Sequence, residues 1–444
     1  MSNQIKRYIW LPLLLGGLFG PLKGQDLLKL DDAINMALEQ NYGILVAKND
    51  AQVAANNAHR GAAGLLPTVA ASAGANYNNN NTKVEFATPA IEPVDARGVE
   101  SNSLNAGINV NYTVFDGLGN VNTFRVLQRS ASLSETQTQA VIEATVSQIG
   151  NLYYSIARLA ESYRTLRESI EISRARLERA KNQLAFGGAN KLAVLNAEVD
   201  LNTDSSSLAV AFFNLENAKR NLNALMGREV DEAFEVSSEV SFSRAISLED
   251  IRQTAQRNNV NVRLAGQSQQ IAALNLKVAK ASYMPVVGVN AGYNYTEANN
   301  GPGSILLSQQ NIGLTLGASI NIPIFSANQR KVSVQNAQLG LLTAQHQRAE
   351  AELNLDRDLT NAYYTYQSTL RQYDLERKSL ERAEENFKRT EDAFKLGQAT
   401  NVQFREAQLN LQRVKDRISD LRFTAKLNEI EILRLSGQLI ATEE

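Results

Sequence analysis

Two very long stretches without proline constrain this chain more than any other feature of its sequence. They cover about residues 120–186 and 327–396, and each contains a single internal glycine, Gly150 or Gly340. At 1.5 Å per residue, a continuous helix over either stretch would be roughly 100 Å long. Helices of globular proteins average about 10 to 14 residues. The sequence therefore predicts an elongated, mainly α-helical protein.

Apolar residues recur in these stretches at alternating spacings of three and four, which is the seven-residue period of a coiled-coil seam. The clearest seam in the first half comprises Ile149, Leu152, Ile156, Leu159, Tyr163, Leu166, Ile170, Ser173, Leu177, Ala180 and Leu184. Near the C-terminus a second seam comprises Leu411, Val414, Ile418, Leu421, Ala425, Asn428, Ile432 and Leu435. Short breaks at Gly187 and Gly397 end the long stretches. We expect the helices on either side of each break to fold back as antiparallel hairpins.

The sequence is duplicated over roughly 200 residues. LKLDDAINMALEQN, from Leu28, corresponds to ISLEDIRQTAQRNN, from Ile246, at an offset of 218, and Pro67 and Pro285 keep that offset. Beyond the strands the offset falls to 210. We assign the eight extra residues to a longer surface loop, about 78–103, in the first copy.

Four runs of alternating polarity occur in pairs, at about 68–78 and 104–115, and at about 286–296 and 311–324. In LNAGINVNYTVF (104–115) the even-numbered residues are apolar and the odd-numbered ones are mostly small or polar, as in a strand with two differently solvated faces. The half-buried sheet of a soluble protein shows the same alternation but usually carries Lys and Glu on its wet face. These polar faces carry neither. Each run is also long enough for a tilted strand to cross a bilayer, which takes about 9 to 11 residues.

Four strands cannot close a barrel, because small closed barrels need about eight. An open edge in lipid leaves unpaired backbone groups that cost several kcal/mol each. The strands of several chains should therefore form one shared β-barrel. The predicted fold class is mainly α with a membrane β-barrel, in which long antiparallel helical hairpins form an α-barrel.

The first 24 residues have the pattern of a secretory signal peptide. Lys6 and Arg7 precede an apolar run over 9–19, and Gly24 stands before Gln25. The run is too short to span a bilayer as a helix. Its removal would leave two structural repeats, 25–227 and 245–444. No later stretch of 18 apolar residues predicts a transmembrane helix.

Composition argues against catalysis and against nucleic-acid binding. The chain has no Cys and only two His, so thiolate nucleophiles and Cys-ligated metal sites are excluded. Once the signal peptide is removed, acidic residues slightly outnumber basic ones. Nucleic acid is therefore not an expected partner. We expect no enzyme activity, no cofactor and no bound metal.

The two sequences that open the last helix of each copy carry a resemblance to a known family. FGGANKLAVLNAEVDL, from Phe186, and LGQATNVQFREAQLNL, from Leu396, together with NIPIF from Asn321, resemble the outer-membrane efflux channel family of the TolC type. The resemblance implies a homotrimer with a twelve-strand barrel in outer-membrane lipid and a twelve-helix tunnel in the periplasm. It also implies a periplasmic adaptor at the helix tips and, through the adaptor, an inner-membrane pump. The implied function is a passive exit duct of a tripartite efflux or type I secretion system.

The same resemblance suggests which residues form the functional site. The predicted adaptor contacts are Gly187, Gly188, Ala189, Asn190, Gly397, Gln398, Ala399 and Thr400. The predicted aperture residues are Ala193, Asn196, Gln403 and Glu406. Family members often carry a ring of acidic residues just past the second tip. Glu406 matches one such position, Gln403 occupies the other, and Glu406 could face either the pore or the outer surface.

Family salt bridges between neighbouring tips do not carry over to this chain. Ala193 and Ala399 stand at the matching positions, so apolar packing and other polar contacts should hold the closed state. The alternative function is that of a periplasmic coiled-coil adaptor or structural protein without a membrane barrel. Such a protein would share the long hairpins but not the four charge-free strands.

Overall fold

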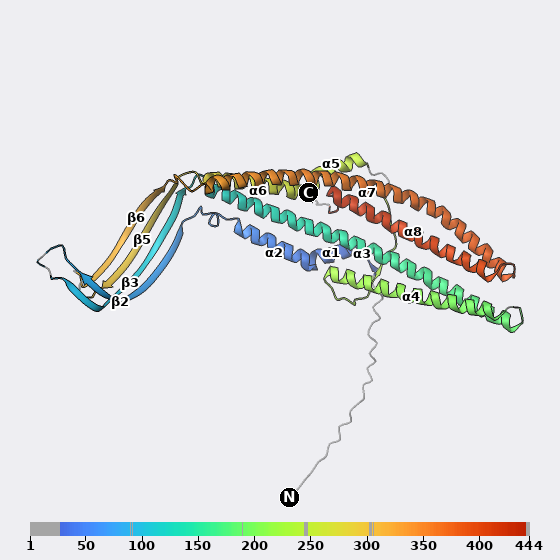
Figure 1. Cartoon of the computed structure of the whole chain (residues 1–444). Helices are drawn as coiled ribbons and strands as arrows, with labels where there is room; N and C mark the ends of the chain where they lie inside the picture. Colours follow the sequence, from blue (N-terminus) through green and yellow to red (C-terminus); the bar gives the residue numbers. More distant parts are fainter. Residues whose placement is uncertain are drawn as a thin grey trace, which may run out of the picture.

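The computed structural model describes residues 27–440, apart from 89, 91, 189, 244–246, 302–303 and 305. These residues form one long, curved body with a β-sheet at one end and two helical tips at the other (Figure 1). The predicted signal peptide, 1–24, and the predicted tip residue Ala189 lie outside the described residues.

Eight helices make up most of the body. They are α1 (Leu30–Gln40), α2 (Tyr42–Asn57), α3 (Gly119–Ala185), α4 (Lys191–Met226), α5 (Leu248–Asn258), α6 (Val260–Ala281), α7 (Gln329–Lys395) and α8 (Asn401–Ser436). Both α3 and α7 have 67 residues and continue without a break through their internal glycines. These two helices set the length of the molecule.

The helices pack side by side in four columns. α3 contacts α2 near the sheet and α4 toward the tips, and it also contacts α6 and α8. α7 contacts α6 and α8 as well. The column order is therefore α2 with α4, then α3, then α6 with α8, then α7. The shorter helices α1 and α5 lie beside the columns near the middle of their length (Figure 1).

A buried or half-buried asparagine joins the two helices that share a column. Asn41 Nδ2 donates to the Leu225 carbonyl at the end of α4 at 2.8 Å, while its Oδ1 accepts from a backbone N–H of α2 at 3.0 Å. Asn259 does the same at the other junction, donating to the Leu435 carbonyl at 2.9 Å and accepting from the start of α6. Each asparagine thus caps the C-terminus of one helix and the N-terminus of the other helix in the same column.

The main sheet is antiparallel, in the order β2–β3–β5–β6. Its strands are β2 (Thr68–Val84), β3 (Val94–Phe115), β5 (Val286–Asn299) and β6 (Ser308–Asn321). The two hairpins have equivalent registers: Thr68 pairs with Asn111, and the corresponding Val286 pairs with Asn321. A second, two-stranded sheet joins β1 (Leu27–Leu28) to β4 (Glu235–Val236).

Three strand boundaries differ clearly from the sequence predictions. The expected loop over 78–103 was wrong, since β2 continues to Val84 and β3 begins at Val94. The Asn-rich sequence there is polar on both faces, which removes the alternation that signals a strand. At the other end of the sheet β6 stops at Asn321 rather than 324, because Pro323 has no N–H to donate to a ladder.

Glycine and asparagine face each other across the polar side of the sheet. The pairs are Gly107 with Asn294, Asn109 with Gly292, and Asn290 with Gly317. A Cβ added at Gly107 would lie 2.1 Å from the Asn294 Oδ1. In each pair the asparagine side chain lies over the facing glycine, where a Cβ would be. A larger residue at any of these three glycines would force the facing asparagine to move.

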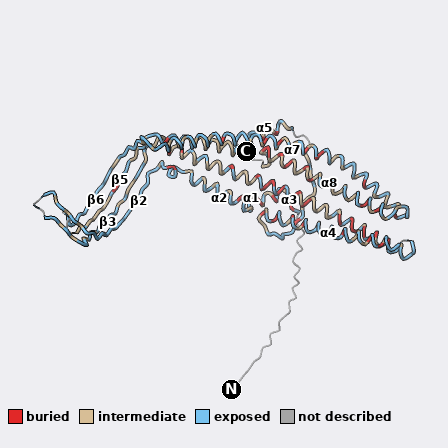
Figure 2. Tube along the Cα trace, in the orientation of Figure 1, coloured by how far each residue is buried: buried red, intermediate tan, exposed pale blue. Residues whose placement is uncertain are grey.

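Buried residues concentrate in the middle of the helical columns, and almost none lie in the sheet (Figure 2). One cluster includes Ile149, Tyr153, Ile156, Leu222 and Met226. A corresponding cluster in the second half includes Ile251, Leu359, Tyr366 and Ile432. Within the described ranges, no helix combines the length and the apolar character needed to cross a membrane.

The junction at Asn259 gives a test of this packing. Asn259→Ala removes an N-cap and leaves the Leu435 carbonyl without its donor, which should lower the free energy of unfolding by about 1–3 kcal/mol. The midpoint of the thermal loss of helical circular dichroism should fall. Asn258→Ala is the matched control, because that exposed side chain makes no hydrogen bond to the described residues. Equal midpoints for the two variants would contradict the role of Asn259.

Candidate functional site

The two tips are tight turns built on glycine. Gly187 has φ +75° and Gly397 has φ +76°, in the left-handed region that other residues rarely adopt. Backbone bonds close each turn, from Gly188 N to the Gln183 carbonyl at 2.7 Å and from Gln398 N to the Ala393 carbonyl at 2.8 Å. This is the C-cap geometry that ends a helix and redirects the chain. The predicted hairpin turns are therefore present at both tips.

The next helix at each tip begins with a side-chain cap. Asn190 Oδ1 accepts from Ala193 N at 3.1 Å. Thr400 Oγ1 accepts from Gln403 N at 3.2 Å, while Gln403 Oε1 accepts from Thr400 N at 2.9 Å. This reciprocal pair is a capping box. Gln403 therefore helps to cap the N-terminus of α8 at the second tip.

The four predicted aperture residues lie on one face of the tip hairpins. Ala193, Asn196 and Glu406 line a groove between α4 and α8. Gln403 and Glu406 line a second groove, between α7 and α8. Glu406 is exposed and has no ion pair or hydrogen bond within the described residues. The structure thus brings these residues together around an unpaired carboxylate.

The opposite face of α8 carries the segment that connects α4 to α5. Lys426 Nζ donates to the Ser241 carbonyl at 3.2 Å, and Glu429 Oε1 accepts from Ser243 N at 3.4 Å. At about 100° per residue, Glu406 lies roughly 160° around the helix from Lys426. The two faces of the helical layer are therefore distinct, and Glu406 points away from the connecting segment.

A buried polar network joins the two tip hairpins to each other. Arg405 of α8 donates two hydrogen bonds to the Asp204 carboxylate of α4, at 2.7 and 2.8 Å. Asp204 is 5% exposed and also accepts from Ser173 Oγ at 2.6 Å. Gln408 Nε2 donates to Ser173 Oγ at 3.2 Å and to Ser169 Oγ at 2.9 Å. Every partner lies within the interface of α3, α4 and α8.

A second ion pair extends this network toward the tips. Arg176 of α3 is 3% exposed and pairs with Asp200 of α4. Asp200 also lies 3.8 Å from the guanidinium of Arg405. Breaking a buried pair by removing one partner typically costs about 3–5 kcal/mol, because it leaves the other charge uncompensated. Asp200 thus pairs with Arg176 within the first hairpin, and its position near Arg405 of α8 adds to the contact between the hairpins.

This network was not predicted from the sequence, although two features of the sequence indicate it. Asp200 and Asp204 are one turn apart on α4. Ser173 interrupts an otherwise apolar seam on α3 at the matching level. A polar residue at a seam position indicates a polar partner across the interface.

Comparison with known proteins identifies the family. The model of the family described as "Outer membrane efflux protein" matches residues 33–228 and 251–438, which is most of the chain. The chain belongs to this family. It is an outer-membrane exit duct for efflux, with the α-barrel and β-barrel architecture of these channels. The alternative of a periplasmic adaptor is not supported.

Individual relatives are similar over nearly their whole length. Outer membrane protein TolC of Vibrio cholerae is 21% identical over 437 residues, covering 97% of this chain and 95% of that protein. The crystal structure of the Campylobacter jejuni CmeC outer membrane channel superposes with a TM-score of 0.80 at 15% identity, covering 94% of this chain and 87% of that one. VceC of Vibrio cholerae gives a TM-score of 0.76 at 18% identity, covering 92% and 96%.

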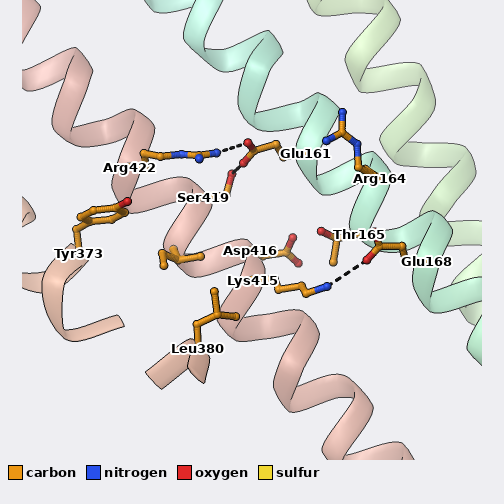
Figure 3. A pocket seen from close by; sticks show the side chains of 11 residues that line it. Glu161, Arg164, Thr165, Glu168, Tyr373, Leu380, Lys415, Asp416, Ser419 and Arg422 are labelled. Carbon is orange, nitrogen blue, oxygen red and sulfur yellow. Dashed lines mark hydrogen bonds and ion pairs between the residues drawn. The ribbon is translucent and has the colours of Figure 1, made fainter. Parts of the chain in front are cut away.

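In this efflux-family chain the interface between the hairpins stays polar well above the tips. Figure 3 shows the pocket where α3 meets α8 at this level, with Glu161 of α3 bonded to Arg422 and Ser419 of α8. Lys415 Nζ also donates to Glu168 at 3.1 Å. Burial raises the pKa of Asp416, against the opposing effects of the Ser162 hydroxyl and nearby Arg158. The interface between the hairpins is therefore charged at this level, while nearer the sheet α8 packs apolar side chains against α3.

A groove with aromatic side chains lies between the two tips of this channel subunit. Phe394 and Phe404 stack at a centroid distance of 4.7 Å, and the Arg179 guanidinium lies 5.2 Å from the Phe394 ring centre. Phe186 borders the same groove and is 90% exposed. Within the described residues, no His, Asp and Glu side chains cluster to form a metal site.

The network between the hairpins can be tested by hydrogen exchange. Asp204→Asn removes the charge that compensates Arg405, so local opening of α8 near the tip should become easier. Amide exchange in residues 404–412 should speed up at least tenfold, which corresponds to about 1.4 kcal/mol. Asp392→Asn is the control, because Asp392 is an exposed tip residue without a side-chain partner in the described chain. Exchange that is no faster than in this control would show that the network does not hold the hairpins.

Proposed function

We propose that three copies of the chain close into one duct, and the observation that carries this proposal is its open edges. β2 and β6 lie at the two edges of the sheet, and nearly all of their residues are exposed. In lipid, unpaired N–H and C=O groups along such edges cost several kcal/mol each. Three copies of a four-stranded sheet give twelve strands, enough for a closed barrel.

The edges of the helical layer support the same arrangement. An exposed apolar stripe on α7 repeats every eleven residues through Leu342, Leu353, Tyr364 and Leu375. An eleven-residue period keeps a stripe nearly straight along a helix. On the opposite edge α4 exposes Val199, Val210 and Phe213. We assign these two surfaces to each other in neighbouring copies, since an apolar strip of this length needs a cover.

The internal duplication also specifies how neighbouring sheets would pair. Ile108 of β3 pairs with Tyr293 of β5. Shifting each residue to its equivalent in the other repeat places Ala318 of β6 opposite Ala75 of the next copy's β2. The same shift places Gly317 opposite Asn76, so the pairing of glycine with asparagine continues around the barrel. The two repeats, 25–227 and 245–444, would then give the trimer an approximate six-fold symmetry.

We infer that the duct is passive and carries out no chemistry. The mature chain would begin near Gln25, after removal of residues 1–24. The tips, with the exposed Phe186 groove, would receive a periplasmic adaptor that links the duct to an inner-membrane pump. The polar interface between hairpins would hold the closed state, because ion pairs can exchange partners as helices slide. The pump would supply both the energy and the selection of most cargo.

The first test of this proposal is the oligomeric state. Native mass spectrometry of the detergent-extracted protein should give three chains, because each chain leaves one β2 edge and one β6 edge to be paired. A stable, correctly folded monomer in the outer membrane would contradict the shared barrel.

The second test concerns the tips. Gly187→Val combined with Gly397→Val forces β-branched residues into the left-handed region, at a cost of about 1–2 kcal/mol per site. Nothing lies within 4 Å of either added Cβ, so the strain is confined to the turns. In a host without its own exit duct in which the wild-type chain restores resistance to toxic compounds, this variant should not restore it, while trimer levels stay unchanged.

Gly266→Val serves as the control for the tip variant. Gly266 lies in α6, has no positive φ, and also has nothing within 4 Å of an added Cβ. Resistance should be retained in the control. Full resistance in the double tip variant would show that the tip geometry is not needed for coupling to the adaptor.

A further inference from the structure

We propose that Arg413 forms a basic ring behind an acidic ring of Glu406, so that the entrance of the duct carries two opposed charge filters. This inference rests on the proposed trimer, in which each position occurs three times around the bore. It assigns ion and cargo preference to a pair of residues of opposite sign.

The first step is that both residues lie on the same face. Glu406 and Arg413 line the groove between α4 and α8, and both also line the groove between α7 and α8. They are seven residues apart on α8, which is two helical turns or roughly 10 Å. Asn410 lies between them, and it also lines the groove between α7 and α8.

The second step is that this face points into the bore. The opposite face of α8 carries the segment connecting α4 to α5, held by Lys426 and Glu429. When the copies close into a tube, that segment has to lie outside, because a passage must remain open within. Glu406 and Arg413 then lie on the inner wall. Arg413 is the deeper of the two as seen from the tip.

Neither Glu406 nor Arg413 is paired with an opposite charge among the described residues. Among the described residues, the Arg413 side chain makes one hydrogen bond, from its Nε to the carbonyl of Leu409 at 3.2 Å. Glu406 has no partner among the described residues. By contrast, Arg389 in the same groove is paired with Glu385 at 2.7 Å. The other polar residues of that groove include Asn386, Gln398 and Gln403, which are uncharged.

Two rings at this spacing act almost independently in salt solution. The Debye length is about 8 Å at physiological ionic strength, shorter than their separation of roughly 10 Å. Three like charges around a narrow bore concentrate ions of opposite sign. Glu406 would favour cations at the mouth, and Arg413 would favour anions one step further in. Solutes that are neutral or zwitterionic would meet no net barrier at either ring.

The membrane strands of the barrel would not select solutes by charge. The polar faces of the predicted strand runs carry Asn, Gly, Ser and Thr but no Lys, Arg, Asp or Glu. Discrimination by charge would therefore be concentrated at the tips.

The test is ion selectivity of purified trimers in planar bilayers, from reversal potentials in a KCl gradient at pH 7. Glu406→Gln should shift the permeability ratio of K⁺ to Cl⁻ toward Cl⁻, and Arg413→Gln should shift it toward K⁺, each by at least about threefold. The double variant should return close to the wild-type ratio. All shifts should shrink in 1 M salt, where the Debye length is about 3 Å.

Two residues on the outward side of α7 provide matched controls. Arg377 and Glu384 are exposed and unpaired in the described chain, and they lie within about 20° of Tyr366, which bonds to the connecting segment. Arg377→Gln and Glu384→Gln should leave the ratio unchanged. If Arg413→Gln trimers conduct but have the same permeability ratio as Arg377→Gln trimers, the basic ring is contradicted and the proposed duct is not. Failure to form trimeric channels would overturn the proposed duct as well.

Discussion

The structure depends above all on the backbone hydrogen bonds that the edge strands cannot make within one chain. A four-stranded sheet has two edges, and here these are the outer sides of β2 and β6. Soluble proteins protect such edges with charges, proline or a covering helix. The edge strands carry no charge or proline over residues 68–78 and 311–321, and their apolar residues are exposed in the single chain. In the proposed duct, lipid covers one face of the strands and neighbouring copies cover the edges.

The helical layer is held together by both apolar packing and polar contacts. Within each hairpin the helices pack through apolar seams, which fix their register. Between the hairpins the interface is apolar near the middle of the body, where Phe423 of α8 packs against Tyr154 of α3. Toward the tips it becomes polar, from Arg422 with Glu161 down to Arg405 with Asp204. Apolar packing gives each hairpin rigidity. In the proposed duct, the polar part of this interface near the tips can exchange hydrogen-bond and ion-pair partners, which is the rearrangement that opening would require.

Much of this architecture could be predicted from the sequence because it follows from periodicity. The long helices, the tip turns at Gly187 and Gly397, and the pairing of strands all depend on local patterns that repeat. The extension of β2 to Val84 was missed because a strand that is wet on both faces has no alternation. The network around Arg405 was missed for a different reason, since it joins residues about 200 positions apart. Its only traces in the sequence are Ser173 in an apolar seam and the spacing of Asp200 and Asp204. Both missed features consist of polar residues, and the periodicity of a sequence does not indicate which partners its polar residues contact.

The central claim, that neighbouring chains share one barrel in the register set by the duplication, can be tested directly by disulfide cross-linking. The chain has no native cysteine, so Ala75→Cys with Ala318→Cys introduces the only two thiols. Because these positions face each other only between copies, oxidation should give a covalent species of three chains that reduction dissolves. Either single variant, or Ala73→Cys with Ala318→Cys, should cross-link poorly. Monomers that stay uncross-linked in the outer membrane, or that form the bond within one chain, would contradict the shared barrel.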